Sequence, residues 1–317
     1  MGDPAGIGPE IVVKALSDPD IQRTCRLVVI GSRPVMAEAI ALSVPALKIN
    51  QISSPKEAAL SAGALNFIEI NGPVRIEKNR PSPESGKASV SYIEKAVDLA
   101  LRKEVDAIVT APISKEALKM SGHPWPGHTE MIAEKCATGE YAMMLTGGPL
   151  RVVLVTIHTA IKNVPGLVRK DSVLKTIRLS KIACDMLSIG NPRIAVAGLN
   201  PHSGEGGIFG TEEIEEIEPA VKQAKREGLP VSGPYPPDTI FHKAYTGEVD
   251  IIVCMYHDQG LIPLKMISFD TGVNTTIGLP IIRTSPDHGT AYDIAWKGIA
   301  SPSSMIEAIK LAIKLRA

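Results

Sequence analysis

The sequence has few aromatic residues, no paired cysteines and no long apolar run. Only 4% of its 317 residues are aromatic, which argues against a surface for stacking nucleic-acid bases. Lys plus Arg and Asp plus Glu both number 34, so no net charge favours nucleic acid or an anionic membrane as partner. The four cysteines are scattered without a CxxC pair. They suit reduced thiols in a cytoplasm better than disulfides or a zinc ribbon. We also expect no membrane span and no signal peptide.

What the sequence does contain is a series of short β-branched runs that alternate with amphipathic helical patterns. Near-continuous apolar character is typical of parallel strands that are buried on both faces. It predicts strands over 26–31, 105–112, 150–158, 192–201 and 249–257. Helices are predicted over 91–104, over 171–190 with Asp171 as N-cap, and over 301–317 with Ser301 as cap. The acidic run 211–220 is predicted to lie on the solvated face of a helix. The pattern indicates a doubly wound α/β protein, and the length indicates two domains.

Three of the seven histidines follow predicted strands: His158, His202 in "NPHSGEGG", and His257 in "DIIVCMYHDQG". Each alone could belong to an ordinary turn, because Asp and Gly commonly end strands. In open α/β sheets, however, ligands bind beyond the carboxyl ends of the strands. We therefore expect the three histidines to lie at the same ligand-binding edge of the sheet. Three imidazoles with an open fourth position suit a catalytic Zn²⁺, Co²⁺, Fe²⁺ or Ni²⁺. Their spacing matches no short zinc motif.

Longer motifs follow one another in a fixed order: "GDPAGIGPE", "TAPISKEAL", "PGHTE", "NPHSGEGGIFG", "GPYPPDTIF", "MYHDQGLIPLK" and "VNTTIGLPIIRTSPDHGTA". Over essentially the whole chain this series resembles the 4-hydroxythreonine-4-phosphate dehydrogenase family of vitamin B6 biosynthesis. The stretch "HGTAYDIAWKGIASP" also resembles the adenosine-binding loop of isopropylmalate and isocitrate dehydrogenases. Neither a Rossmann GxGxxG nor a Walker A motif is present.

The resemblance implies an isocitrate/isopropylmalate-dehydrogenase-like α/β fold, with two α/β/α domains and an active-site cleft between them. We expect residues 1–125 and 275–317 to form one domain. Residues 126–274 should form the other and carry the metal ligands and dimer contacts. The implied protein is a cytoplasmic homodimer whose active sites are shared across the interface. Its implied cofactors are NAD, or alternatively NADP, and a divalent metal, zinc before cobalt or magnesium.

The implied reaction belongs to pyridoxal phosphate biosynthesis. It oxidises 4-phosphooxy-L-threonine to 2-amino-3-oxo-4-(phosphooxy)butanoate, which loses CO₂ to give 3-amino-2-oxopropyl phosphate. A related subfamily acts on 4-phospho-D-threonate or 4-phospho-D-erythronate in sugar-acid catabolism, and Trp296, where many relatives have Gly, leaves that alternative open. A nucleotide-binding protein that has lost turnover is a further alternative. The three strand-end histidines and Lys265 weigh against it, because NAD binding alone needs none of them.

The resemblance also assigns residues. The metal ligands are His158, His202 and His257, with His257 reaching across the dimer. The substrate-binding residues, whose charges and donors suit a phosphate ester, are His128, Thr129, Lys265, Asn274 and Arg283. The NAD-binding loop is His288, Gly289, Thr290, Ala291 and Asp293.

Two further assignments concern catalysis. Lys265 is the candidate for proton transfer, because a nearby metal charge would lower its pKa, although it could serve phosphate binding alone. Asp238 either orients the substrate or caps the helix that follows it. Members of the family also carry a short strand ahead of the glycine-rich turn. Because Met1 already lies inside that motif, we expect the first core strand to be missing from the sequence as given.

Overall fold

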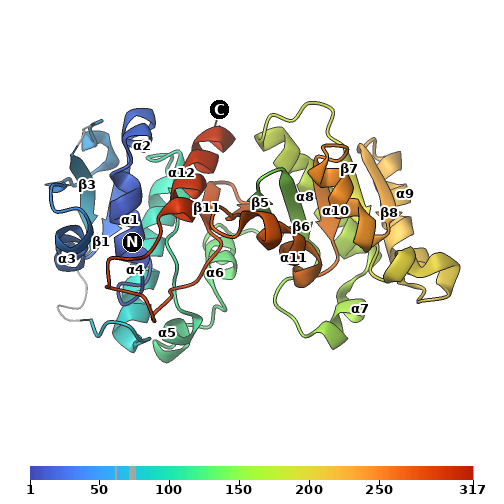
Figure 1. Ribbon diagram of the computed structural model, residues 1–317, viewed down its shortest axis with the longest axis horizontal. Helices are drawn as coiled ribbons and strands as arrows, with labels where there is room; N and C mark the ends of the chain where they lie inside the picture. Colours follow the sequence, from blue (N-terminus) through green and yellow to red (C-terminus); the bar gives the residue numbers. More distant parts are fainter. Residues whose placement is uncertain (61–62, 71–75, 317) are drawn as a thin grey trace. The chain divides into compact units, whose positions relative to one another are not determined.

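The computed structural model describes residues 1–60, 63–70 and 76–316, which divide into two compact units (Figure 1). The first unit comprises Met1–Gly139 and Leu279–Ala317, and the second comprises Glu140–Gly278. Both boundaries lie further along the chain than the expected 125/126 and 274/275. The reason at the first boundary is helix α6 (His128–Lys135). Its Met131 and Ile132 belong to an apolar core of the first unit, so the chain leaves that unit only after α6.

The first unit is built on two groups of parallel strands. Strands β1 (Val28–Gly31), β3 (Ala64–Glu69) and β2 (Lys48–Gln51) pair in that order, and β4 (Ala107–Val109) pairs with β11 (Ile282–Pro286). Its helices are α1 (Gly8–Leu16), α2 (Pro19–Thr24), α3 (Arg33–Ser43), α4 (Pro83–Leu101), α5 (Lys115–Met120), α6 and α12 (Ser303–Arg316). Helix α12, from the C-terminal end of the chain, packs against α1 and β11 (Figure 1). The two ends of the sequence therefore share one core.

The second unit contains strands in the order β10 (Val273–Ile277), β5 (Ala142–Gly147), β6 (Leu150–Leu154), β9 (Ile251–Cys254), β7 (Ile194–Ala197) and β8 (Val231–Tyr235). Pairs β6–β9, β9–β7 and β7–β8 are parallel as predicted, but β10–β5 and β5–β6 are antiparallel. The strands predicted in this unit are therefore parallel to one another, and both antiparallel pairs involve β5, which was not predicted as a strand. Strands β5 and β6 are joined by the turn Gly148–Pro149, and so short a connection permits only an antiparallel hairpin.

The helices of the second unit are α7 (Val164–Leu167), α8 (Lys170–Met186), α9 (Glu218–Arg226), α10 (Pro237–Tyr245) and α11 (His257–Ser268). Shorter helical turns occur at Ile161–Asn163, at Pro201–Gly207 and, with π-type bonding, at Glu213–Ile217. Within the described ranges, no helix is both long and apolar enough to cross a membrane.

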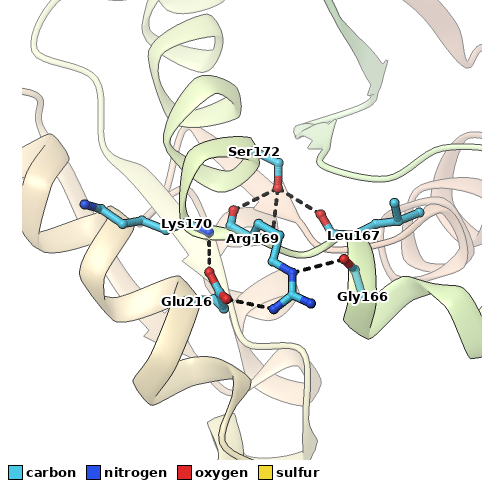
Figure 2. Close-up of polar contacts among 6 residues, drawn as sticks. All are labelled: Gly166, Leu167, Arg169, Lys170, Ser172 and Glu216. Carbon is cyan, nitrogen blue, oxygen red and sulfur yellow. Dashed lines mark hydrogen bonds and ion pairs between the residues drawn. The ribbon is translucent and has the colours of Figure 1, made fainter.

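The start of α8 is organised by residues that the local sequence does not single out (Figure 2). The sequence predicts Asp171 as the N-cap, but the helix begins at Lys170 and Asp171 lies in its first turn. Ser172 Oγ accepts the backbone N–H of Arg169 at 3.0 Å. Glu216 accepts the N–H of Lys170 at 2.6 Å and an Nη1 bond from Arg169 at 2.9 Å. These contacts, the Lys170 bond first, lower the pKa of Glu216. Helix α8 is thus tied to the segment that precedes α9.

A cavity of about 690 Å³ lies within the first unit. Strands β1 and β4 line it, together with side chains of α1, α4 and α12. Its lining also includes the exposed residues Arg26, Asp106 and Arg316, so the cavity opens to the surface of the unit.

Candidate functional site

His158, His202 and His257 follow three neighbouring strands of the second unit. Strand β9 pairs in parallel with β6 on one side and with β7 on the other. His158 comes shortly after β6, His202 after β7, and His257 begins the helix that follows β9. Because the carboxyl ends of parallel strands meet at one edge, all three histidines belong to the same edge of the sheet, where α/β proteins bind ligands.

Two of these histidines come together within one chain. The ring centroids of His158 and His257 are 5.6 Å apart, with planes inclined at 40°. His257 Nδ1 lies 2.6 Å from Asp258 Oδ1. A carboxylate on one ring nitrogen fixes the tautomer and leaves the other nitrogen to a metal, which is the usual support for a metal-binding histidine. Asp258 was not predicted as a site residue, although its place directly after His257 is a usable signal.

His202 is placed differently. Its ring centroid lies 6.1 Å from that of Phe209. Among the residues that the structure describes, no three His, Cys, Asp or Glu side chains gather as a metal ion would require. One chain therefore presents a histidine pair, His158 and His257, and a third histidine elsewhere on the same edge. Neutral imidazoles, one of them backed by a carboxylate, fit a zinc or cobalt ion as a partial ligand set.

The turn that carries His202 has an unusual backbone. Residues 202–206 all have positive φ values, from 41° to 78°. Left-handed conformation costs about 1–2 kcal/mol for each residue that is not glycine, so tertiary contacts must hold this turn. The carboxylate of Glu213, which is only 2% exposed, holds the residues that lead into the turn. It accepts the N–H groups of Leu199 and Asn200 at 2.7 and 2.8 Å and the side-chain amide of Asn200 at 2.9 Å.

Close packing around Glu213 completes this anchor. A Cβ atom at Gly204 would lie 2.8 Å from Glu213 Oε2, and one at Gly198 would lie 3.0 Å from Oε1. The prediction that the acidic run 211–220 lies on a solvated face is therefore wrong for Glu213. The local pattern of charges cannot distinguish this one buried carboxylate from its exposed neighbours.

We expect Glu213→Ala to destabilise the second unit by roughly 2–4 kcal/mol, because three partly buried donors would lose a charged acceptor. Denaturant unfolding monitored by circular dichroism measures this. Glu215→Ala, in the same acidic segment but exposed, is the matched control and should change stability by less than about 0.5 kcal/mol. Equal effects of the two substitutions would show that Glu213 does not anchor the turn.

The first unit holds a second group of polar residues around Arg283. The guanidinium of Arg283, 2% exposed on β11, donates from Nε and Nη2 to Thr110 Oγ1 at 3.2 and 2.8 Å. Burial lowers the pKa of Arg283 to about 10, so it remains charged at neutral pH. Near it, His128 is half-buried, and its Nε2 is shielded from solvent without a hydrogen-bond partner among the described residues. Burial, and then the charge of Arg283, lower the pKa of His128 well below its usual value.

The remaining expected substrate-binding residues are distributed over both units. Thr129 follows His128 in α6 and is buried. Asn274 lies on β10 of the second unit, and its Oδ1 is buried without a hydrogen-bond partner within the described residues. Lys265 belongs to α11, the helix that starts with His257, and its Nζ is 5.9 Å from the ring centroid of Phe269. The structure thus brings together His128, Thr129 and Arg283 in one unit, and carries Lys265 and Asn274 in the other.

Asp238 does not have the expected capping role. Helix α10 begins at Pro237, its N-cap residue is Pro236, and no side chain caps it. Asp238 therefore lies in the first turn of the helix, and its side chain is exposed. The two prolines before it already fix the chain direction at this helix start, which leaves no capping position for Asp238.

The loop 288–293 packs against the glycine-rich turn at the start of the chain. The Thr290 carbonyl accepts the N–H of Ile7 at 3.0 Å. A Cβ atom at Gly6 would lie 2.9 Å from Thr290, so only glycine permits this approach. Tyr292 donates its hydroxyl to the buried Asp3 at 2.7 Å. Burial raises the pKa of Asp3 although that bond opposes the rise.

Two motifs that are far apart in the sequence therefore form one structure. His288, Gly289 and Asp293 are exposed on it, and Thr290 and Ala291 are partly buried. The backbone N–H of Trp296 also donates to the buried Glu10. The loop is thus fixed from behind by buried carboxylates while its outer residues remain accessible to a ligand.

The fold belongs to the class of isocitrate-dehydrogenase-like α/β proteins. Isocitrate dehydrogenase from Methylococcus capsulatus aligns with 98% of this chain and 83% of its own length at a TM-score of 0.53, with 13% identity. A crystal structure of 4-hydroxythreonine-4-phosphate dehydrogenase from Klebsiella pneumoniae aligns far more closely, at a TM-score of 0.92 and 41% identity, and covers 100% of this chain and 96% of that one. The predicted fold class is confirmed.

Sequence comparison gives the family. The sequence model of the pyridoxal phosphate biosynthetic protein PdxA family matches residues 23–312, and the chain belongs to this family. A protein of Desulforapulum autotrophicum named 4-hydroxythreonine-4-phosphate dehydrogenase is 50% identical over 98% of this chain and 93% of its own length. A protein of Pectobacterium atrosepticum named D-threonate 4-phosphate dehydrogenase is 44% identical over 99% of this chain and 97% of its own.

Proposed function

We propose that this protein is an oxidoreductase that uses NAD and a divalent metal to oxidise 4-phosphooxy-L-threonine at its carbinol carbon. The product is 2-amino-3-oxo-4-(phosphooxy)butanoate, which loses CO₂ to give 3-amino-2-oxopropyl phosphate. Membership of the PdxA family and the names of the relatives support this activity. The observation that carries it is the histidine pair His158 and His257 with Asp258 at the ligand-binding edge of the sheet.

The proposed metal ligands are His158, His257 and His202. A metal held there would polarise the substrate hydroxyl and lower its pKa. Asp258 holds the His257 ring in the tautomer that leaves Nε2 to the metal. Imidazole ligands favour zinc or cobalt, whereas magnesium prefers oxygen ligands.

The protein is proposed to act as a homodimer in which each metal site uses both subunits. His158 and His257 meet within one chain, and the described residues contain no group of three His, Cys, Asp or Glu that could hold a metal ion, so we propose His202 as the ligand that a second subunit would supply. This differs from the division implied by the family resemblance, in which His257 crosses the dimer. Apolar side chains support an interface: Met266 and Phe269 near the end of α11 are 82% and 79% exposed, and Ile208 close to His202 is 73% exposed. Such residues on a protein surface commonly mark a partner contact.

Substrate phosphate and carboxylate require cations and directional donors. Arg283 and Lys265 carry positive charge, and His128, Thr129 and Asn274 offer hydrogen bonds. A buried guanidinium such as that of Arg283 interacts strongly with an anionic substrate group, because water does not screen that interaction. Lys265 is also the proposed acid–base residue. Its place on the helix that begins with His257 connects it to the metal ligands.

The exposed side of the 288–293 loop is the proposed NAD site, with NADP as the alternative coenzyme. His288, Gly289 and Asp293 are accessible there. Asp3 and Glu10 hold the loop through Tyr292 and Trp296. A loop that is fixed before the coenzyme binds loses less conformational entropy on binding.

A second candidate substrate is 4-phospho-D-threonate, and the 44% identical relative named D-threonate 4-phosphate dehydrogenase favours it. This compound carries a hydroxyl where phosphooxythreonine has an ammonium group, while the phosphate, the oxidised alcohol and the carboxylate are shared. 4-Phospho-D-erythronate offers the same groups with a different stereochemistry.

Reduction of NAD with each compound tests the proposal. The 317-residue protein, loaded with zinc or cobalt, is expected to produce absorbance at the reduced-nicotinamide band fastest with 4-phosphooxy-L-threonine. A higher kcat/KM for 4-phospho-D-threonate or 4-phospho-D-erythronate would assign the protein to the second candidate activity. No reduction of NAD or NADP by a metal-loaded dimer with any of the three compounds would refute both.

A further inference from the structure

Asn79 lies between β3 and α4 and contacts the loop that carries the proposed coenzyme site. Its side-chain amide donates to the carbonyl of Tyr292 at 3.0 Å and to the carbonyl of Ala295 at 2.7 Å. None of the motifs on which the family resemblance rests includes Asn79, and 213 and 216 positions separate it from its two partners. The contact therefore arises from the tertiary fold and has no local signal in the sequence.

The two carbonyls that accept these bonds belong to one short turn. The N–H groups of Ile294 and Ala295 both donate to the carbonyl of Ala291, at 3.1 and 3.0 Å. The last carbonyls of such a helical turn have no partners inside the turn, and one primary amide has two N–H groups to donate. Asn79 therefore closes the end of the turn that presents Asp293, an exposed residue of the proposed coenzyme site.

The backbone of Asn79 has a separate role. Its φ is 65°, a left-handed conformation that asparagine tolerates better than most residues and that glycine adopts freely. Its N–H donates to the carbonyl of Ala5 in the glycine-rich turn at 3.0 Å. Asn79 thus binds the glycine-rich turn through its backbone and the coenzyme loop through its side chain, so substitutions can separate the two contacts.

The residue before Asn79 attaches the same segment to two further elements. The ammonium group of Lys78 lies 4.0 Å from the ring centroid of Trp296, within the range of a cation–π interaction. Lys78 also forms an ion pair with Glu38 of α3. Asn79 therefore reaches the coenzyme loop from a segment that is itself held by that loop and by a helix.

We propose that Asn79 is a positioning residue for the coenzyme, which holds the turn 291–295 in the conformation in which the 288–293 loop binds NAD. This inference rests on the coenzyme site proposed above. Asn79 acts through the loop and does not itself contact the coenzyme. A loop that is held in its binding conformation loses less conformational entropy when the ligand binds. Loss of the two amide bonds should therefore weaken coenzyme binding and leave the binding of the phosphorylated substrate unchanged.

A purely structural role is the alternative, and the exposed position of Asn79 makes the two roles separable. Asp3 and Glu10, which hold the same loop, are completely buried, whereas Asn79 is exposed. Substitution of an exposed residue usually changes the free energy of unfolding little. An effect of Asn79 on the coenzyme site should therefore be measurable in a protein that folds normally.

The test uses Asn79→Gly, which permits the left-handed backbone but removes both amide bonds, and Asn79→Asp, which keeps the size but cannot donate when ionised. Both are expected to raise the Kd for NAD, measured by isothermal titration calorimetry, by about 5- to 20-fold. Both should also speed amide hydrogen exchange in 291–296 without coenzyme. Asn191→Gly is the matched control, because Asn191 is an exposed asparagine of the second unit with a φ of 50°. It should behave like the unsubstituted protein.

A higher Kd together with faster exchange, in both Asn79 variants but not in Asn191→Gly, supports the inference. An unchanged Kd, an equal effect of Asn191→Gly, or an effect of Asn79→Gly that Asn79→Asp lacks would overturn it. So would an equal rise in KM for the phosphorylated substrate. A higher Kd without faster exchange would mean that Asn79 contacts the coenzyme directly, which also contradicts a positioning role. If the unsubstituted protein bound neither NAD nor NADP, the proposed coenzyme site itself would be refuted, and this inference with it.

Discussion

A mixed dimer of one subunit with His158→Ala and one with His257→Ala is expected to be inactive. The two rings are 5.6 Å apart within one chain, so both should bind the same metal from the same subunit. Each of the two sites in this mixed dimer then lacks one ligand. Loss of a ligand to a catalytic metal should reduce turnover by at least about 100-fold.

A second mixed dimer, His202→Ala with His257→Ala, is expected to recover about half the activity. If a second subunit supplies His202, one site receives both substitutions and the other receives none. Activity should be measured as NAD reduction, and bound zinc should be measured by elemental analysis. Chelation of the unsubstituted dimer should abolish turnover and provides the reference for complete metal loss.

The activities of the two mixed dimers together show which subunit supplies each of the three metal ligands. Recovery in both would mean that His257 crosses the dimer while His158 and His202 share a chain, as the family resemblance implies. Inactivity in both would mean that all three ligands belong to one chain. Full activity in a demonstrably metal-free preparation would refute the metal-dependent mechanism itself.

Arg283→Ala should raise KM for a phosphorylated substrate by about 10- to 150-fold, which corresponds to the roughly 1.5–3 kcal/mol of a charge-assisted contact. The effect should be large because the guanidinium is buried, where water cannot screen its interaction with an anion. A dephosphorylated analogue should be affected much less. Steady-state kinetics with both compounds measure the difference, and a melting curve establishes that the variant is folded.

Arg102→Ala is the matched control, because Arg102 belongs to the same unit but forms an exposed ion pair with Asp98. It should change KM by less than about twofold, since such pairs contribute little. If Arg283→Ala raised KM equally for phosphorylated and dephosphorylated compounds, Arg283 would not contact the phosphate.

The sequence was sufficient to predict the five apolar strands and the common edge of the three histidines. Both follow from one physical rule, because buried parallel strands must be apolar along their length and their ends converge. The direction of β5 was not predictable from that rule. It depends on the short turn at Gly148, which reverses the chain before a crossover helix can form.

Single side chains in tertiary contact were harder to predict. Glu213 looks like its acidic neighbours in the sequence, and only the folded turn at 202–206 shows why it is buried. The position of His202 relative to His158 and His257 depends on that same left-handed turn. Asp is common at helix N-caps, but neither Asp171 nor Asp238 is the N-cap of its helix. The N-cap residues are Arg169 and Pro236 instead. Local propensity therefore predicts where a helix lies more accurately than it predicts the residue at which the helix begins.

The contact between the glycine-rich turn and the 288–293 loop fixes the order in which this protein can mature. Asp3 and Tyr292 are 289 positions apart, and Glu10 and Trp296 are 286 apart. A ribosome delivers the amino-terminal residues first, so Asp3 and Glu10 must wait for nearly the whole chain before their partners emerge. The proposed coenzyme loop is consequently among the last parts to form. A nascent or prematurely ended chain can contain every histidine of the second unit and still lack the contacts that hold the proposed coenzyme loop.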